Sequence, residues 1–167
     1  MMVNIAELNT GIGKEVSFAF ETSAEAMDAV SEGCTFEAPI VVRGKATNTG
    51  VCYRLEGIIA CRKSFACDRC LEPCTEEQTV EFSEDFRRAG DGGSEDANVF
   101  EGDTVDITGM VRDTLLAAQP LSNICKPDCK GLCPVCGANL NHGDCGCERF
   151  VPDPRLAALQ QWKKDFE

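Results

Sequence analysis

The chain has 167 residues, 28 acidic against 16 basic side chains, and a formal net charge of −12. This length fits one domain with an appendage, or two small domains. The acidic excess argues against a strong non-specific nucleic-acid binder, because such proteins displace phosphate counterions with lysine and arginine. A basic protein partner suits the charge better, although solubility alone would also account for it.

The 12 cysteines are the unusual feature of the composition. Disulfide frameworks of this kind are usual in much smaller secreted chains. Met1–Thr10 has neither the basic start nor the apolar segment of a secretory signal. No apolar run approaches the roughly 20 residues of a membrane span. We therefore expect a cytoplasmic protein, in which close cysteine pairs favour metal or redox chemistry.

The first half of the chain is predicted to be rich in β-structure. Alternating apolar residues in Lys14–Glu21 have the period of a half-buried strand. Pro39–Arg43 is a β-branched run, and Thr79–Phe86 is a further candidate strand. Between them, after a turn, apolar residues alternate again at Val51, Tyr53 and Leu55, and Ile58, Ile59 and Cys61 extend the apolar content. Short turns between such segments favour an antiparallel meander or a small partial barrel. Ser23–Val30 has a pattern compatible with two helical turns.

A change in character follows the strands. Arg87–Gly102 is rich in glycine and acidic residues and lacks periodicity, so we expect a mobile surface loop, with acidic docking as the alternative. Asp106–Gln119 is predicted to be a helix that covers one face of the sheet, with Asp106 as its cap and Pro120 as its stop. Its apolar face consists of Ile107, Met110, Val111 and Leu115.

The end of the chain is predicted to be a second helix, Asp153–Glu167. Asp153 would cap it, and Pro154 would take the favoured first position. Its apolar stripe would pack against the body of the protein, and the alternative is a partner contact through Trp162. The predicted fold class is therefore α+β, a β-rich sheet or partial barrel covered by a helix. The predicted parts are a β-rich domain (1–121), a cysteine-rich zinc-binding segment (122–150) and a terminal helix (151–167).

Four close cysteine pairs carry the chemistry of the chain. A structural zinc site commonly uses four thiolates, and a two-residue spacer lets one turn direct two sulfurs at one metal. Closeness in sequence predicts a local site from Cys133, Cys136, Cys145 and Cys147. Elimination then predicts a long-range site from Cys67, Cys70, Cys125 and Cys129. Other pairings stay open, including Cys125 and Cys129 with Cys133 and Cys136, and either one or two ions.

The other candidate ligands are weaker. His142 lies between the halves of the local site, and we expect it to be an exposed loop residue. Cys34, Cys52 and Cys61 are expected to be small apolar residues, and Cys74 a spare ligand. A dithiol redox centre lacks the usual βαβ context, and the spacing does not match ferredoxin clusters. An all-cysteine zinc site has no open position for water, so we expect no enzyme.

Several segments together resemble one family. Cys67–Pro73 (CDRCLEP), Cys125–Asn141 (CKPDCKGLCPVCGANLN), Cys145–Cys147 and Asp153–Leu156 are similar, in this order, to the YceD family of large ribosomal RNA subunit accumulation proteins. The resemblance covers most of the chain. Its first cysteine pair matches a motif that cysteine-poor members keep, its second pair matches the next family block, and the last four cysteines match cysteine-rich members.

The resemblance implies a bacterial protein, with plastid relatives, that supports accumulation or processing of 23S rRNA. It implies no enzymatic activity that transfers to named residues. The expected function is a non-enzymatic ribosome-biogenesis factor stabilised by structural Zn²⁺. The expected partner is a ribosome-assembly protein or large-subunit precursor with limited rRNA contact, without a membrane or small-molecule substrate. The alternatives are a thiol redox or metal-sensing protein and a generic adaptor, and the oligomeric state stays open.

Overall fold

The computed structural model describes residues 1–90, 97–149 and 155. The chain divides into two compact units. The sheet unit consists of Met1–Ala66 and Pro73–Asn123, and the cysteine unit consists of Cys67–Glu72 and Ile124–Glu167. The cysteine unit thus takes a short loop from between two strands of the sheet unit. The predicted terminal helix lies, except for Arg155, outside the described residues.

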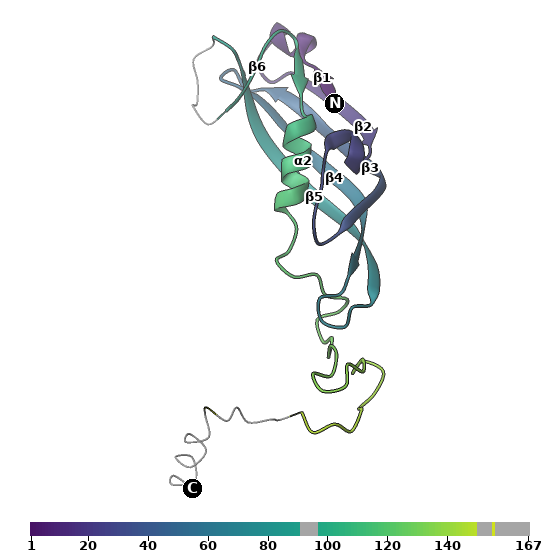
Figure 1. The fold of residues 1–167 in the computed structure, drawn as a ribbon. Coiled ribbons are helices and arrows are strands. Elements are labelled where there is room, and N and C mark those ends of the chain that lie inside the picture. Colours follow the sequence, from purple (N-terminus) through teal and green to yellow (C-terminus); the bar gives the residue numbers. More distant parts are fainter. Residues whose placement is uncertain (91–96, 150–154, 156–167) are drawn as a thin grey trace. The chain divides into compact units, whose positions relative to one another are not determined.

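The sheet unit is built on five strands in the order of the chain (Figure 1). They are β2 (Glu15–Thr22), β3 (Thr35–Asn48), β4 (Tyr53–Ala66), β5 (Pro73–Arg88) and β6 (Asn98–Phe100). Neighbouring strands are antiparallel except β5 and β6, which are parallel. Two further short strands, β1 (Met2–Asn4) and β7 (Thr104–Asp106), form a separate antiparallel pair.

These strands agree with the alternating patterns but extend beyond them. The candidate strand Thr79–Phe86 is the second half of β5, which begins at Pro73, where the missing N–H of proline is tolerated. The predicted loop Arg87–Gly102 is wrong at two places, because β5 runs to Arg88 and Asn98–Phe100 is β6. The parallel pairing of β6 with the end of β5 has no sequence signal, since only three residues take part.

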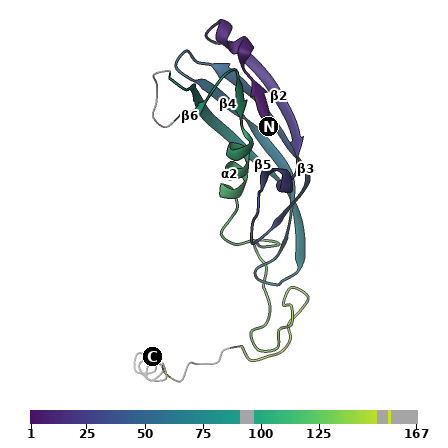
Figure 2. The ribbon, with the colours of Figure 1, turned by 45° about the horizontal axis from the view of Figure 1, so that its top comes forward.

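A helix covers one face of the sheet, which we call the inner face. α2 (Thr108–Ala117) lies along β4 and β5 (Figures 1 and 2), and its Val111 and Leu115 are fully buried. It is shorter than predicted by two residues at each end, although Oδ1 of Asp106 accepts the N–H of Thr108 at 2.9 Å. The segment predicted as two turns is the single turn α1 (Ala24–Met27), and a 3-10 turn, η1, covers Ala6–Thr10. The sheet unit is therefore mostly sheet with few helices.

Two glycines allow the central strands to approach closely. Gly44 and Gly57 are direct cross-strand partners, in a row that also contains Phe18 and Phe82. The two aromatic rings stack with centroids 6.5 Å apart. A Cβ atom on Gly57 would lie 2.2 Å from the carbonyl oxygen of Arg43, so no side chain fits without backbone movement.

Gly57→Ala is therefore expected to lower the free energy of unfolding by about 1–3 kcal/mol, the range typical of overpacking. Urea denaturation followed by circular dichroism measures it. Gly109→Ala is the control, since a Cβ on Gly109 meets nothing within 4 Å and alanine is the better helix former inside α2. Equal stability of the two variants would contradict the steric argument.

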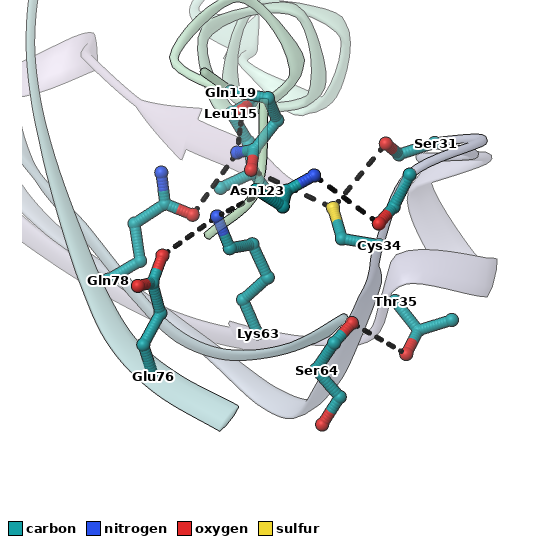
Figure 3. Close-up of polar contacts among 11 residues, drawn as sticks. Ser31, Cys34, Thr35, Lys63, Ser64, Glu76, Gln78, Leu115, Gln119 and Asn123 are labelled. Atoms are coloured by element: carbon teal, nitrogen blue, oxygen red, sulfur yellow. Dashed lines mark hydrogen bonds and ion pairs between the residues drawn. The ribbon is translucent and has the colours of Figure 1, made fainter. Parts of the chain in front are cut away.

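A buried lysine, Lys63 of β4, lies on the inner face of the sheet (Figure 3). The side chain of Lys63 is 1% exposed, and its Nζ lies 2.8 Å from Oε1 of Glu76 and 3.2 Å from Oδ1 of Asn123. The ammonium also lies 5.0 Å from the centroid of Phe65. Gln119 donates to Oε1 of Gln78 at 3.1 Å in the same cluster. Strand alternation predicts an apolar residue at position 63, so this cluster has no sequence signal.

Removal of Glu76 would take away the carboxylate that balances the charge of the buried Lys63 ammonium. Glu76→Ala is expected to cost about 2 kcal/mol of unfolding free energy, less than a fully buried pair because Glu76 is itself 49% exposed. Glu77→Ala removes the neighbouring carboxylate, which pairs with the exposed Arg62 at 2.7 Å, and is expected to cost less than about 1 kcal/mol. Chemical denaturation at low and high salt compares the two, and only the Glu77 effect should fade with salt.

Candidate metal centre

The first cysteine turn occupies the loop between β4 and β5. The carbonyl oxygen of Cys67 accepts the N–H of Leu71 at 2.8 Å, and the N–H of Cys67 donates to the carbonyl oxygen of Glu72 at 2.9 Å. Leu71 has a φ of +60°, which is unusual for a residue with a side chain. This tight turn presents Cys67 and Cys70 side by side.

The second cysteine turn repeats this hydrogen-bond pattern. The carbonyl oxygen of Cys133 accepts the N–H of Gly137 at 2.9 Å, and the N–H of Cys133 donates to the carbonyl oxygen of Ala138 at 2.8 Å. Gly137, which follows the second cysteine as Leu71 does, has a φ of +75°. Glycine adopts this conformation without strain. Both Cys-x-x-Cys segments therefore form one kind of turn, from different sequences.

The structure brings eight sulfurs together in two groups, and within each the four sulfurs lie within 4.8 Å of one another. Zinc–sulfur bonds of about 2.3 Å in a tetrahedron place neighbouring sulfurs about 3.8 Å apart. The sulfurs of Cys67 and Cys129 are 3.9 Å apart, and those of Cys70 and Cys125 are 3.7 Å apart. These distances fit a shared metal ion and are too long for disulfides. The first group is Cys67, Cys70, Cys125 and Cys129, and the second is Cys133, Cys136, Cys145 and Cys147.

The two groups differ in burial. In the first group Cys67, Cys70 and Cys129 are buried and Cys125 is intermediate. In the second group only Cys133 is buried, and Cys136 is exposed. The first group is thus the more sheltered one.

Hydrogen bonds from backbone N–H groups stabilise the thiolate form of Cys67 in the first group and of Cys133 in the second. Burial opposes ionisation of Cys67, but three backbone N–H groups outweigh it and lower the pKa of its thiol to about 6. Backbone N–H groups of Cys136 and Val135 likewise lower the pKa of Cys133 to about 6. The donors to Cys67 belong to Cys125, Cys70 and Arg69.

Cys147 and Cys125 resist ionisation, because neighbouring sulfurs and burial raise their pKa values. The sulfurs of Cys136 and Cys145 raise the pKa of Cys147 to about 12. Burial and the sulfur of Cys129 raise the pKa of Cys125. Four adjacent thiols cannot all ionise unless a cation offsets their charge. The donor set and its electrostatics therefore suit a divalent cation of the zinc type.

Polar side chains surround the first group. The guanidinium of Arg69 donates to the carbonyl oxygen of Cys129 at 3.1 Å. The amide of Asn141 donates to the sulfur of Cys129 at 3.3 Å, and this contact lowers the pKa of that thiol. Sequence patterns gave no indication of either role, because no local signal tells which sulfur a distant side chain reaches.

The other candidate ligands lie outside both groups. Nε2 of His142 is 3.0 Å from Oε1 of Glu72, and its side chain is 72% exposed. Among the described residues, the four remaining cysteines do not belong to any group of side chains that could hold a metal ion. Cys34 and Cys61 are buried in the apolar core of the sheet unit, and Cys52 and Cys74 are half-buried.

A family model described as large ribosomal RNA subunit accumulation protein YceD matches residues 55–163, a segment that contains both sulfur groups. The chain belongs to the YceD family. Within that family, the chain is 30% identical over 151 residues to a maize (Zea mays) protein named large ribosomal RNA subunit accumulation protein YCED homolog 1, chloroplastic. That match covers 71% of this chain and 52% of the relative.

A second relative of this YceD-family chain is an uncharacterized protein of Mycobacterium tuberculosis. It is 30% identical over 136 residues, which cover 78% of this chain and 63% of the relative. The chain thus spans about half to two thirds of the length of these relatives. No solved structure matches. No helix in the described part of the chain is long and apolar enough to cross a membrane.

Proposed function

We propose that this protein supports the accumulation of large-subunit ribosomal RNA as a non-enzymatic assembly factor. The family description and the name of the maize relative support the role in rRNA accumulation. The observation that carries the non-enzymatic part is the pair of four-sulfur groups. A tetrahedral ion held by four thiolates has no open position for water or substrate, so such a site stabilises structure.

In this proposal each of the two groups of four cysteines holds one zinc ion. Zinc would supply positive charge and a fixed tetrahedral geometry. The chain supplies the backbone N–H groups that stabilise the thiolates, and the turns at Cys67–Leu71 and Cys133–Gly137 that aim them. A cytoplasmic location stays a prediction.

The distribution of charge supports a basic assembly protein as the direct partner. The sheet unit contains 20 acidic and 9 basic residues, and the cysteine unit contains 8 and 7. Nearly all of the acidic excess therefore lies in the sheet unit. That unit would repel RNA phosphates and attract a cationic protein surface, so any limited rRNA contact falls to the cysteine unit.

Depletion of the protein tests the proposed role directly. We expect mature 23S rRNA to fall and its precursors to rise, measured by northern blot and by subunit profiles on sucrose gradients. A plasmid copy carrying Cys52→Ser should restore both, because Cys52 lies outside the two sulfur groups. A copy carrying Cys129→Ser should not. Unchanged rRNA after depletion would refute the proposed function.

The thiol redox or metal-sensing alternative predicts a different result on the purified protein. Zinc bound at both groups would leave few thiols free to react, whereas a redox protein would cycle an accessible disulfide. Metal quantification together with thiol titration distinguishes the two.

A further inference from the structure

Asn141 belongs in sequence to the second sulfur group but contacts the first. It lies in the loop between Cys136 and Cys145, which joins the two halves of the second group. Its Nδ2 donates to the sulfur of Cys129 at 3.3 Å, and its Oδ1 accepts the backbone N–H of Lys130 at 2.9 Å. One amide side chain thus holds both a candidate ligand and the backbone beside it.

The loop that carries Asn141 is itself fixed to the chain that follows Cys129. The N–H of Leu140 donates to the carbonyl oxygen of Gly131 at 2.9 Å, and an antiparallel bridge pairs Leu132 with Asn139. The N–H of Asn141 donates to Oδ1 of Asn139 at 2.9 Å. The conformation of this loop and the hydrogen bonds of the first group are therefore set together.

We propose that Asn141 is a positioning residue through which metal binding at the second group strengthens metal binding at the first. This inference rests on the proposed metal binding. A metal that joins the two halves of the second group closes the loop between them and restricts Asn141. The Asn141 amide then loses less conformational entropy when it donates to the sulfur of Cys129, and this hydrogen bond stabilises the charged ligand. Because such linkage is reciprocal, metal at the first group strengthens the second equally.

The first test isolates the hydrogen bond to sulfur. Asn141→Asp keeps the oxygen that accepts from Lys130 but loses the donor to Cys129. Asn139→Asp is the matched control, since it adds the same charge to the same loop and keeps the oxygen that accepts from Asn141. The full chain is freed of metal under reducing conditions and reloaded with Zn²⁺ against a competing chelator, or with Co²⁺ for its sulfur-to-cobalt absorption band.

Asn141→Asp is expected to weaken Zn²⁺ binding at the first group about tenfold or more, the usual effect of losing an outer contact to a metal ligand. It is also expected to shift the cobalt band of that group, which a general loss of stability would not do. Asn139→Asp should change neither. An unchanged first-group affinity in Asn141→Asp would overturn the proposal.

The second test measures the coupling. Cys136→Ser/Cys147→Ser disables the second group and is expected to weaken the first in the same direction. Adding Asn141→Asp to that variant should then cost little more, because both changes act through one contact. Losses that multiply would overturn the role of Asn141. A wild-type chain that binds no metal would overturn the metal centre as well, whereas two bound ions with an unaffected Asn141→Asp variant would overturn this inference alone.

Discussion

Removal of metal with a chelator is expected to unfold the cysteine unit of the full chain and to leave the sheet unit folded. Residues 67–72 and 124–149 contain no helix, and their only β-pairing is the Leu132–Asn139 bridge. The apolar core cluster draws all its described members from the sheet unit. A segment without such a core depends on metal binding, which contributes about 10–16 kcal/mol in zinc peptides.

Hydrogen exchange measured by mass spectrometry on the full chain tests this expectation. With zinc, amides in residues 129–142 should be protected, and after chelation they should exchange as in an unfolded chain. The amides of β3 and β4 serve as the internal control and should keep their protection. Added zinc should restore the first pattern. Equal protection of residues 129–142 with and without metal would show that the segment folds by other means.

Substitution of single cysteines is expected to remove metal one equivalent at a time. Cys67→Ser and Cys129→Ser should each reduce the bound zinc from two equivalents to one, and so should the double variant, because the two sulfurs belong to one group. Cys133→Ser should remove the other equivalent. Loss of a ligand thiolate opens the tetrahedron and leaves three sulfurs with uncompensated charge.

Metal quantification on purified variants, combined with their thermal unfolding, provides the measurement. Cys52→Ser is the control, since Cys52 lies outside both groups, and it should retain two equivalents. The combined variant Cys129→Ser/Cys133→Ser should retain none. If it retained one equivalent, these two sulfurs would share a metal, and the alternative pairing of Cys125 and Cys129 with Cys133 and Cys136 would be right.

The sheet was the more predictable part of the fold. Alternation in β2 and β4 arises because one face is buried, so the pattern of apolar residues reports the strand directly. The same reasoning fails at Lys63, where Glu76 and Asn123 compensate a charge inside the core. It fails also at β6, whose pairing depends on where the chain returns and not on its own three residues.

For the candidate metal centre, sequence spacing predicts both turns and the partners of the Cys133 turn, but it leaves the partners of the Cys67 turn open. Cys-x-x-Cys defines a local turn, and the turn at Cys133 formed as its glycine and proline suggest. The grouping of Cys67 with Cys129 depends on contacts made across the chain, and the sequence predicts it only by elimination. The structure places those sulfurs together, while ligation of zinc stays a prediction. Asn141 could not be assigned a role from the sequence, because only the folded loop shows that its amide contacts the sulfur of Cys129.

The discontinuous cysteine unit imposes an order on synthesis. Cys67 and Cys70 leave the ribosome first, and Cys125 follows Cys70 by 55 positions. At about 5–20 residues per second, this separates the two halves of the first group by roughly 3–11 seconds of translation. During that interval the early pair lacks Cys125 and Cys129, the two sulfurs that complete its group. A nascent chain that stalls before Cys129 therefore leaves Cys67 and Cys70 without their metal-site partners, and the first group can be completed only after Cys129 has been added.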